Sequence, residues 1–151
     1  MSQSYLTWKA LHVLGAILML GNVIVTGAWT AILWRNRSEA SQRQIAHGIL
    51  WTDLLFTLVG GTLMVISGIQ MIRVADLPWR DTAWLMRGIE ALGFTALFWL
   101  LVLLPDQWRM ERCSPTDVTR FGRLFRRWSI LGWLVTPVLL WGLWTMVTKP
   151  V

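Results

Sequence analysis

Four long apolar runs, separated by short polar stretches, dominate the pattern of hydrophobic and polar positions. A helix needs about 20 consecutive apolar residues to cross the hydrocarbon core of a bilayer. The pattern therefore predicts an all-α fold, a bundle of four transmembrane helices that forms one domain. The spans cover about 5–34, 45–72, 82–104 and 128–147, with Pro105 and Asp106 closing the third. Residues 107–127 are expected to form a basic cytoplasmic segment before the fourth span.

Composition supports a membrane protein and excludes several other classes. Only 15% of the residues are charged, whereas soluble domains average about 25%. The net charge of +6 could indicate a nucleic-acid partner, but the four apolar runs exclude a soluble nucleic-acid binder. The single cysteine, Cys113, excludes an intramolecular disulfide and a zinc site built on cysteines.

Basic residues are distributed unequally between the two ends of the predicted bundle, which indicates its orientation. The end that includes the first and third connections carries nine, and the end with the termini carries five. Because basic residues favour the cytoplasmic side, we expect a multi-pass protein of the bacterial inner (plasma) membrane with both termini periplasmic. The nine are Arg35, Arg37, Arg43, Arg109, Arg112, Arg120, Arg123, Arg126 and Arg127; the five are Lys9, Arg73, Arg80, Arg87 and Lys149.

A weak internal repeat relates the two halves of the chain. Residues 9–15 and 87–93 share an order of basic, small, aliphatic and polar positions that ends in Leu-Gly, at an offset of 78. The repeat predicts two helical hairpins related by an axis along the membrane normal. It also predicts that His12 and Glu90 are equivalent and lie at the same depth.

Ionisable residues inside the membrane are the candidates for function, because each costs about 2.5–3.5 kcal/mol to insert at the bilayer centre. Lys9 and His12 share a face of the first helix, and Arg87 and Glu90 share a face of the third. These four residues are predicted to meet in a polar pocket of the outer leaflet. Two structural alternatives to this pocket stay open. Lys9 would extend its ammonium group to the membrane surface, and Arg87 and Glu90 would form an ion pair with each other.

Three further polar residues lie at other depths. Asn22 and Asp53 fall at similar levels in the first two helices, and His47 lies close to the cytoplasmic surface. Asn22 and Asp53 are expected either to hydrogen-bond across the two helices or to take part in proton movement. His47 is expected to be an interfacial histidine.

The leading functional hypothesis is a haem b-binding protein with a redox or electron-transfer role. A neutral imidazole is a common axial ligand of haem iron, which makes His12 the candidate metal ligand, and Lys9 and Arg87 could pair with the propionates. The second axial ligand stays open: a methionine, Glu90, or a residue of a second copy in a homodimer. The alternative is a cofactor-free accessory or transport subunit, in which the buried charges are structural or conduct protons.

The first helix also carries a family resemblance. The run Lys9-Ala10-Leu11-His12 with Gly15, the run Leu20-Gly21-Asn22, and residues 53–57 followed by Gly60-Gly61 and Ser67-Gly68 resemble the family of small bacterial membrane proteins called domain of unknown function 2269. The resemblance implies a four-helix membrane protein and no settled activity.

A more distant similarity is to the HemJ-type protoporphyrinogen oxidases and the CopD-like copper resistance proteins, whose first helix opens on a comparable Lys/Leu-His pattern. In the HemJ-type proteins this histidine is associated with haem b, which implies the same role for His12. Residues 16–21 lack the aromatic-rich continuation and the Pro-Arg pair of that family. The similarity therefore implies haem b and leaves open whether the chain is a membrane oxidoreductase. A redox role would also require a membrane redox partner.

Overall fold

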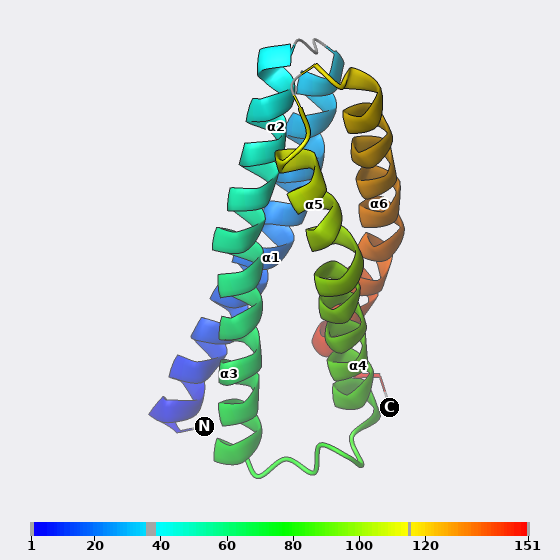
Figure 1. The fold of residues 1–151 in the computed structure, drawn as a ribbon. Helices are drawn as coiled ribbons and strands as arrows, with labels where there is room; N and C mark the ends of the chain where they lie inside the picture. The colour runs from blue at the N-terminus through cyan, green and yellow to red at the C-terminus, as the bar shows by residue number, and fades with distance from the viewer. Residues whose placement is uncertain (1, 36–38, 115, 151) are drawn as a thin grey trace.

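Long helices make up nearly all of the computed structural model, which describes residues 2–35, 39–114 and 116–150. Four continuous helical stretches are long and apolar enough to cross a membrane: Gln3–Arg35, Gln42–Val74, Ala83–Glu111 and Val118–Thr148. They alternate in direction, so both termini lie at the same end of the bundle (Figure 1). The predicted fold class and the four spans are therefore confirmed, while Arg37 of the charge count lies outside the described residues.

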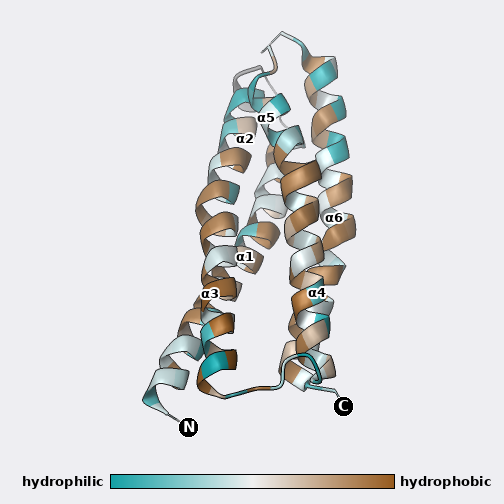
Figure 2. Cartoon of the chain, turned by 60° about the horizontal axis from the view of Figure 1, so that its bottom comes forward, coloured by the Kyte–Doolittle hydropathy of each residue, from teal (hydrophilic) through white to brown (hydrophobic). Residues whose placement is uncertain are grey.

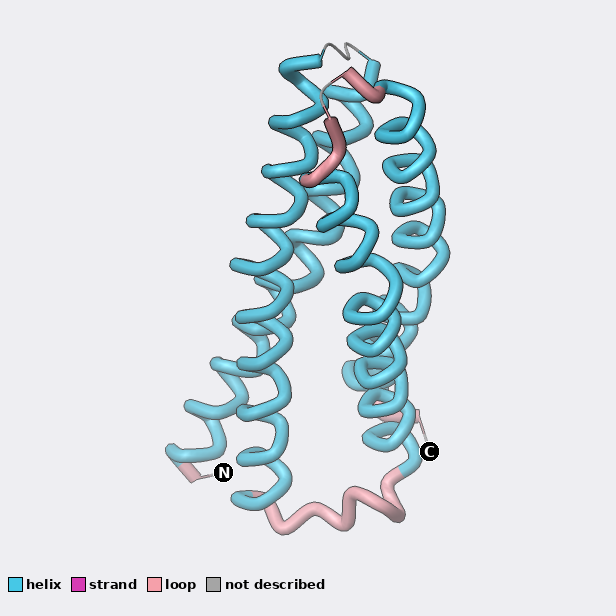
Figure 3. Tube along the Cα trace, viewed as in Figure 1, coloured by secondary structure: helices cyan, strands magenta, loops and turns pink. Residues whose placement is uncertain are grey.

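Two of the four spans are composite, because each contains a π-helical segment. The order is α1 (Gln3–Arg35), α2 (Glu39–Thr52), η1 (Asp53–Leu58), α3 (Val59–Val74), α4 (Ala83–Phe98), η2 (Trp99–Leu103), α5 (Leu104–Glu111) and α6 (Val118–Thr148). Here η1 and η2 are π-helices. Figure 3 shows the connections between α3 and α4 and between α5 and α6 at opposite ends of the bundle.

The third span extends beyond the end that the sequence predicts. The sequence places its end at residue 104, before Pro105, but the helix continues through α5 to Glu111. Proline lacks a backbone N–H and is tolerated in the first turn of a helix, and Pro105 lies in the first turn of α5, directly after the π-helical segment η2. The first part of the basic segment 107–127 is consequently helix that continues the third span rather than connection.

The bundle consists of two helical hairpins. In the first, α1 packs along α3, and in the second, α4 packs along α6. Gly15 and Gly60 bring the first pair into backbone contact: a Cβ atom at Gly15 would lie 2.7 Å from the carbonyl oxygen of Gly60. In the second pair a Cβ atom at Gly142 would lie 2.8 Å from the Cβ atom of Ala91. Small residues at such positions allow transmembrane helices to approach closely.

The two hairpins are joined mainly at the end that lies opposite the termini. The buried apolar core gathers there, from α2, the end of the third span and the first half of α6. Toward the termini, α1 with α3 diverges from α4 with α6 (Figures 1 and 2). The largest members of this core are Ile45, Ile49, Met110, Phe121, Phe125 and Trp128.

Most large apolar side chains lie on the outside of the bundle. Leu101 is 73% exposed and Leu134 is 67% exposed, as expected where lipid is the solvent of the helix surface. Figure 2 shows hydrophobic residues along the middle of the helices and hydrophilic residues toward the ends. The bundle surface is therefore consistent with an integral, multi-pass membrane protein.

Candidate functional site

Asp53 is the centre of a buried polar network that joins three segments of the chain. Its side chain is 6% exposed. Asn22 Nδ2 donates to Asp53 Oδ1 at 2.6 Å, and Trp99 Nε1 and Gln107 Nε2 donate to Oδ2 at 3.1 and 2.5 Å. Thr57 Oγ1 adds a longer contact of 3.4 Å to Oδ1. We call Asn22, Asp53, Thr57, Trp99 and Gln107 the Asp53 hub.

The hub lies where both π-helical segments occur. Asp53 is the first residue of η1 and Trp99 is the first residue of η2. π-Helical turns are rare and are frequent at functional sites. The bilayer core offers no water to unpaired polar groups. The four donors around the Asp53 carboxylate therefore provide the hydrogen bonds that water would otherwise make. The hub thus ties the first hairpin to the second at the level where both spans change helix type.

The network continues along α1 toward the end opposite the termini. Thr26 Oγ1 donates to Asn22 Oδ1 at 3.0 Å and lies 3.4 Å from Thr52 Oγ1. Thr30 Oγ1 donates to the carbonyl oxygen of Thr26 at 2.6 Å. The cross-helix hydrogen bond that the sequence leaves open for Asn22 and Asp53 is therefore present, within a larger network.

A second buried acid in the third span escaped the sequence analysis. Asp106 is fully buried, with Arg109 Nη1 3.0 Å from Oδ1 and Arg127 Nε 3.1 Å from Oδ2. The Arg127 contact is an ion pair whose angle departs from that of a hydrogen bond. Arg127 of the predicted basic segment therefore joins the third span to α6, while Arg109 pairs with Asp106 within α5.

A cavity of about 610 Å³ lies between the two hairpins and is bounded on one side by the hub. Asp53, Thr57 and Trp99 line it together with apolar side chains from α1, α3, α4 and α6. Both hairpins contribute walls, and the lining reaches Arg35 on the side of the hub that lies opposite the termini. The apolar and aromatic part of its lining includes Met19, Val23, Leu92, Leu103, Phe125 and Trp133.

His12 lies inside the first hairpin and faces α3. Its Nδ1 atom is 3.0 Å from the carbonyl oxygen of Met64 and 3.2 Å from Ser67 Oγ. Ser67 Oγ already donates to the carbonyl oxygen of Leu63, and a carbonyl can only accept. The Nδ1 atom must therefore carry the proton, which leaves Nε2 as the free acceptor of a neutral ring. An Nδ1–H anchored on a carbonyl is the usual arrangement of a metal-ligating histidine.

The other three residues of the predicted outer-leaflet pocket do not gather around His12. Lys9, Arg87 and Glu90 are exposed, and Lys9 belongs to α1 whereas Arg87 and Glu90 belong to α4 of the other hairpin. Arg87 and Glu90 do not form the ion pair that the sequence leaves open, since the salt bridges of the described residues do not include them. His12 and Glu90 also lack the equivalent surroundings that the repeat predicts, because only His12 faces the other helix of its hairpin.

His47 lies at the edge of α2 and is largely exposed. Its Nδ1 atom is 3.0 Å from Glu111 Oε1, and its ring is tilted against Trp51. This agrees with an interfacial histidine. Within the described ranges, no group of three or more His, Cys, Asp or Glu side chains is arranged to hold a metal ion, so a metal would depend on His12 with ligands of another kind.

The polar residues that the sequence singles out do not form one connected hydrogen-bonded network in the described part of the chain. Asp53 and Asn22 are hydrogen-bonded to each other, but His12 bonds to α3 and His47 bonds to Glu111. These three groups of contacts share no residue. The polar residues therefore form separate sites: a hub, a histidine within the first hairpin, and an interfacial pair.

Comparison with known proteins supports the family and no more specific relationship. No curated protein and no solved structure gives a significant match, so the similarity to HemJ-type and CopD-like proteins rests on the pattern around His12 alone. Residues 6–150, nearly the whole chain, match the family described as predicted integral membrane protein (DUF2269). The match covers all four spans and both hairpins. The chain therefore belongs to the DUF2269 family of predicted integral membrane proteins.

Proposed function

We propose that this protein binds an apolar, membrane-soluble molecule in the cavity between its two hairpins. The observation that carries the proposal is the cavity itself, about 610 Å³ in volume and bounded by the Asp53 hub. Small-molecule sites in proteins have volumes of about 300–1,000 Å³, mostly apolar walls and a few polar groups that orient the ligand.

The hydrogen bonds of the lining favour an apolar ligand over an ion or a water path. Thr30, Thr95 and Thr136 line the cavity, and their hydroxyls donate to carbonyl oxygens of their own helices. Both oxygens of Asp53 accept hydrogen bonds from the hub. The ligand that fits best is therefore largely apolar.

The lining also supports entry from the lipid phase. Several lining residues are among the exposed large apolar residues of the bundle surface. A molecule dissolved in the bilayer would thus meet one continuous apolar path from lipid to cavity. The lining residues concerned are Ile24, Leu58, Val65, Ile66, Leu100 and Trp133.

Replacing Gly132 with phenylalanine should remove the bound molecule. Gly132 lines the cavity, and a Cβ atom there would have no neighbour within 4 Å, so the new ring occupies open space without a backbone clash. We expect the apolar compound that co-purifies with the protein, measured by mass spectrometry of an organic extract, to fall about tenfold, equivalent to about 1.4 kcal/mol.

Gly93→Phe is the matched control for this experiment. Gly93 also has no neighbour within 4 Å of a Cβ atom, but it is exposed on α4 and does not line the cavity. This variant should retain the compound at the wild-type level. If the extract of the wild-type protein contains no stoichiometric apolar compound, or if Gly132→Phe retains it, the cavity is not a binding site.

Haem b binding with a redox or electron-transfer role is a second candidate, and one specific observation favours it. The hydrogen bond from His12 Nδ1 to the Met64 carbonyl leaves Nε2 free in the tautomer that coordinates iron. Lys9 and Arg87 lie on different hairpins, so they do not support propionate binding within one copy. A second ligand from another copy, in a homodimer, would complete the coordination that one protomer lacks.

An absorbance spectrum of the detergent-purified protein tests this candidate. If haem b is bound, the dithionite-reduced protein will have a Soret band and a sharp α-band, and His12→Ala will lose both while still inserting. His47→Ala is the control, because His47 lies in the interfacial pair with Glu111 and should leave the spectrum unchanged. A flat spectrum that added haemin does not alter would reject haem for this protein.

We also propose that the protein lies in a bacterial inner membrane with both termini periplasmic. The support is the excess of arginines at the end of the bundle that lies opposite the termini. A cofactor-free accessory subunit remains compatible with the buried polar groups, since the hub and the Asp106 contacts stabilise helix packing without any cofactor.

A further inference from the structure

A second, smaller pocket lies between the start of α2 and the end of α5, with Phe121 of α6 at its side. Its volume is about 310 Å³, and its lining is more polar than apolar. Two arginines line it, Arg43 from α2 and Arg112 at the end of α5, together with Gln42, Glu111 and Ser114. We call it the basic pocket. The start of α2 and the end of α5 lie at the end of the bundle opposite the termini (Figure 1), and the basic pocket shares no described lining residue with the cavity between the hairpins.

The two arginines of the basic pocket are free to bind an anion. The salt bridges of the described residues engage Arg109 and Arg127, both with Asp106, but neither Arg43 nor Arg112. Arg112 has a cation–π contact with the ring of Trp108, with 5.6 Å between its guanidinium carbon and the ring centroid. This contact leaves the N–H groups of Arg112 available, because a cation over an aromatic face makes no hydrogen bond to it.

The acid in the basic pocket does not cancel this charge. One carboxylate oxygen of Glu111 is bound to His47 Nδ1 at 3.0 Å, and the other is buried without a partner. Two arginines thus line the pocket together with one carboxylate, which is already bound to His47. The remaining charge of the pocket is positive.

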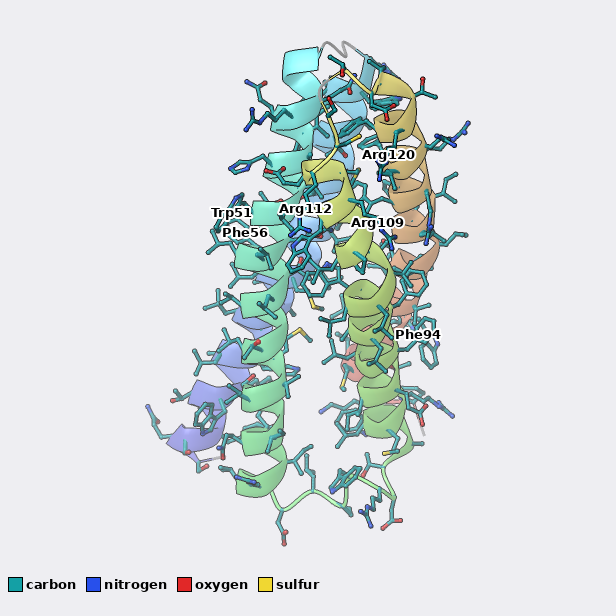
Figure 4. All side chains as sticks on the ribbon, viewed as in Figure 1. Trp51, Phe56, Phe94, Arg109, Arg112 and Arg120 are labelled. Carbon is teal, nitrogen blue, oxygen red and sulfur yellow. The ribbon has the colours of Figure 1, made fainter. Side chains whose placement is uncertain are left out.

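The surroundings of the basic pocket match the depth of lipid headgroups. Trp108 and Trp51 are both exposed, on the third and second spans, and tryptophan gathers at the boundary between lipid and water. In Figure 4, Arg112 and Arg109 lie at about the same height of the bundle as Trp51. Basic pockets between transmembrane helices at the cytoplasmic side are typical binding sites for anionic lipid headgroups.

We propose that the basic pocket binds a phosphate group, supplied by the headgroup of an anionic phospholipid, between Arg43 and Arg112. Guanidinium groups bind phosphate oxygens through paired, charge-assisted hydrogen bonds. The bound headgroup bridges α2 and α5 across the join between the two hairpins. This site is independent of the apolar ligand proposed above, and each can fail without the other.

Native mass spectrometry of the full-length protein, with phosphatidylglycerol or phosphatidylcholine added to the detergent, tests the proposal. The wild-type protein is expected to retain phosphatidylglycerol in preference to phosphatidylcholine. Changing both Arg43 and Arg112 to glutamine should weaken phosphatidylglycerol binding by about tenfold or more, the order expected for two arginines at an anionic lipid surface.

Changing both Arg120 and Arg123 to glutamine is the matched control. These arginines are exposed near the start of α6, and neither lines the basic pocket. This control removes the same charge outside the pocket and should change binding less than twofold, because exposed charges that lie away from the bound group are screened by salt. Equal losses in the two double variants would mean a diffuse surface charge and would overturn the proposal, as would unchanged binding in the pocket variant.

A competition with inorganic phosphate distinguishes a lipid site from a site for a soluble phosphate compound. Phosphatidylglycerol that stays bound in millimolar phosphate supports the lipid headgroup. Displacement by phosphate at lower concentrations would overturn that assignment. Thermal unfolding of both double variants checks that they are folded, and Arg43→Lys with Arg112→Lys keeps the charge and should retain part of the binding if the variants to glutamine unfold.

Discussion

Replacing Asp53 with alanine is expected to lower the free energy of unfolding in detergent by about 3 kcal/mol or more. The change leaves donors of Asn22, Trp99 and Gln107 without an acceptor in a buried site. Each stranded buried donor costs about 1–3 kcal/mol, and cross-helix hydrogen bonds in membrane proteins fall at the low end of such values. Titration from mild detergent into a denaturing detergent, followed by circular dichroism and tryptophan fluorescence, measures the loss.

Glu90→Ala is the matched control, because it removes a membrane carboxylate that is exposed and has no polar partner. Its effect should stay within about 0.5 kcal/mol, as for ordinary surface substitutions. Asp53→Asn should cost nearly as much as Asp53→Ala, since the amide brings an N–H toward the donors of Trp99 or Gln107. Similar effects of Asp53→Ala and Glu90→Ala would show that the hub does not hold the hairpins together.

Replacing Gly15 with alanine should destabilise the bundle by about 2 kcal/mol, within the range found for overpacked interiors. A Cβ atom at Gly15 would lie 2.7 Å from the Gly60 carbonyl oxygen and 2.9 Å from the Met64 backbone nitrogen. These neighbours are backbone atoms, so α1 and α3 must move apart. The same measurement of unfolding in detergent detects the change, and Gly60→Ala should act similarly because its Cβ atom would lie 2.8 Å from the Gly15 carbonyl oxygen.

Gly21→Ala separates this contact from the general effect of glycine in a helix. Gly21 lies on the same helix, and a Cβ atom there has no neighbour within 4 Å. Alanine is a better helix former than glycine by about 1 kcal/mol, so Gly21→Ala should be neutral or slightly stabilising. If Gly15→Ala has the same effect as Gly21→Ala, then α1 and α3 are not in backbone contact at that point.

The spans could be predicted from the sequence, because runs of about twenty apolar residues are typical of transmembrane helices. The pairing of Asn22 with Asp53 could also be anticipated, since both residues fall at the same depth of adjacent helices. The weak repeat at an offset of 78 residues predicted two hairpins, but it did not predict which side chains face the partner helix. Glu90 is exposed on α4 whereas His12 faces α3, because a repeat in residue order does not fix the rotation of a helix about its axis.

Gln107 and Asp106 were missed for a single reason. Pro105 is a usual helix terminator, so the polar residues after it resemble a connection. The structure continues the helix, and the inward face runs on through Leu103, Gln107 and Met110 at intervals of three to four residues. That spacing was available in the sequence. The π-helical segments η1 and η2 could not be read from the sequence, because a π-helical turn is a local change in backbone hydrogen bonding that these residue types do not mark.

The divergence of the hairpins has a mechanical consequence. The hub and the adjoining core act as a fulcrum, and η1 with α3 forms a lever from Asp53 to Val74, about 32 Å long at 1.5 Å per residue. A rotation of about 5° at the fulcrum moves the far end by about 3 Å, for a lever of that length. Such a displacement would widen the lipid-facing side of the cavity without breaking a hydrogen bond of Asp53. The divergence of the two hairpins from the hub thus leaves one end of the bundle rigid and gives access to the cavity from the other.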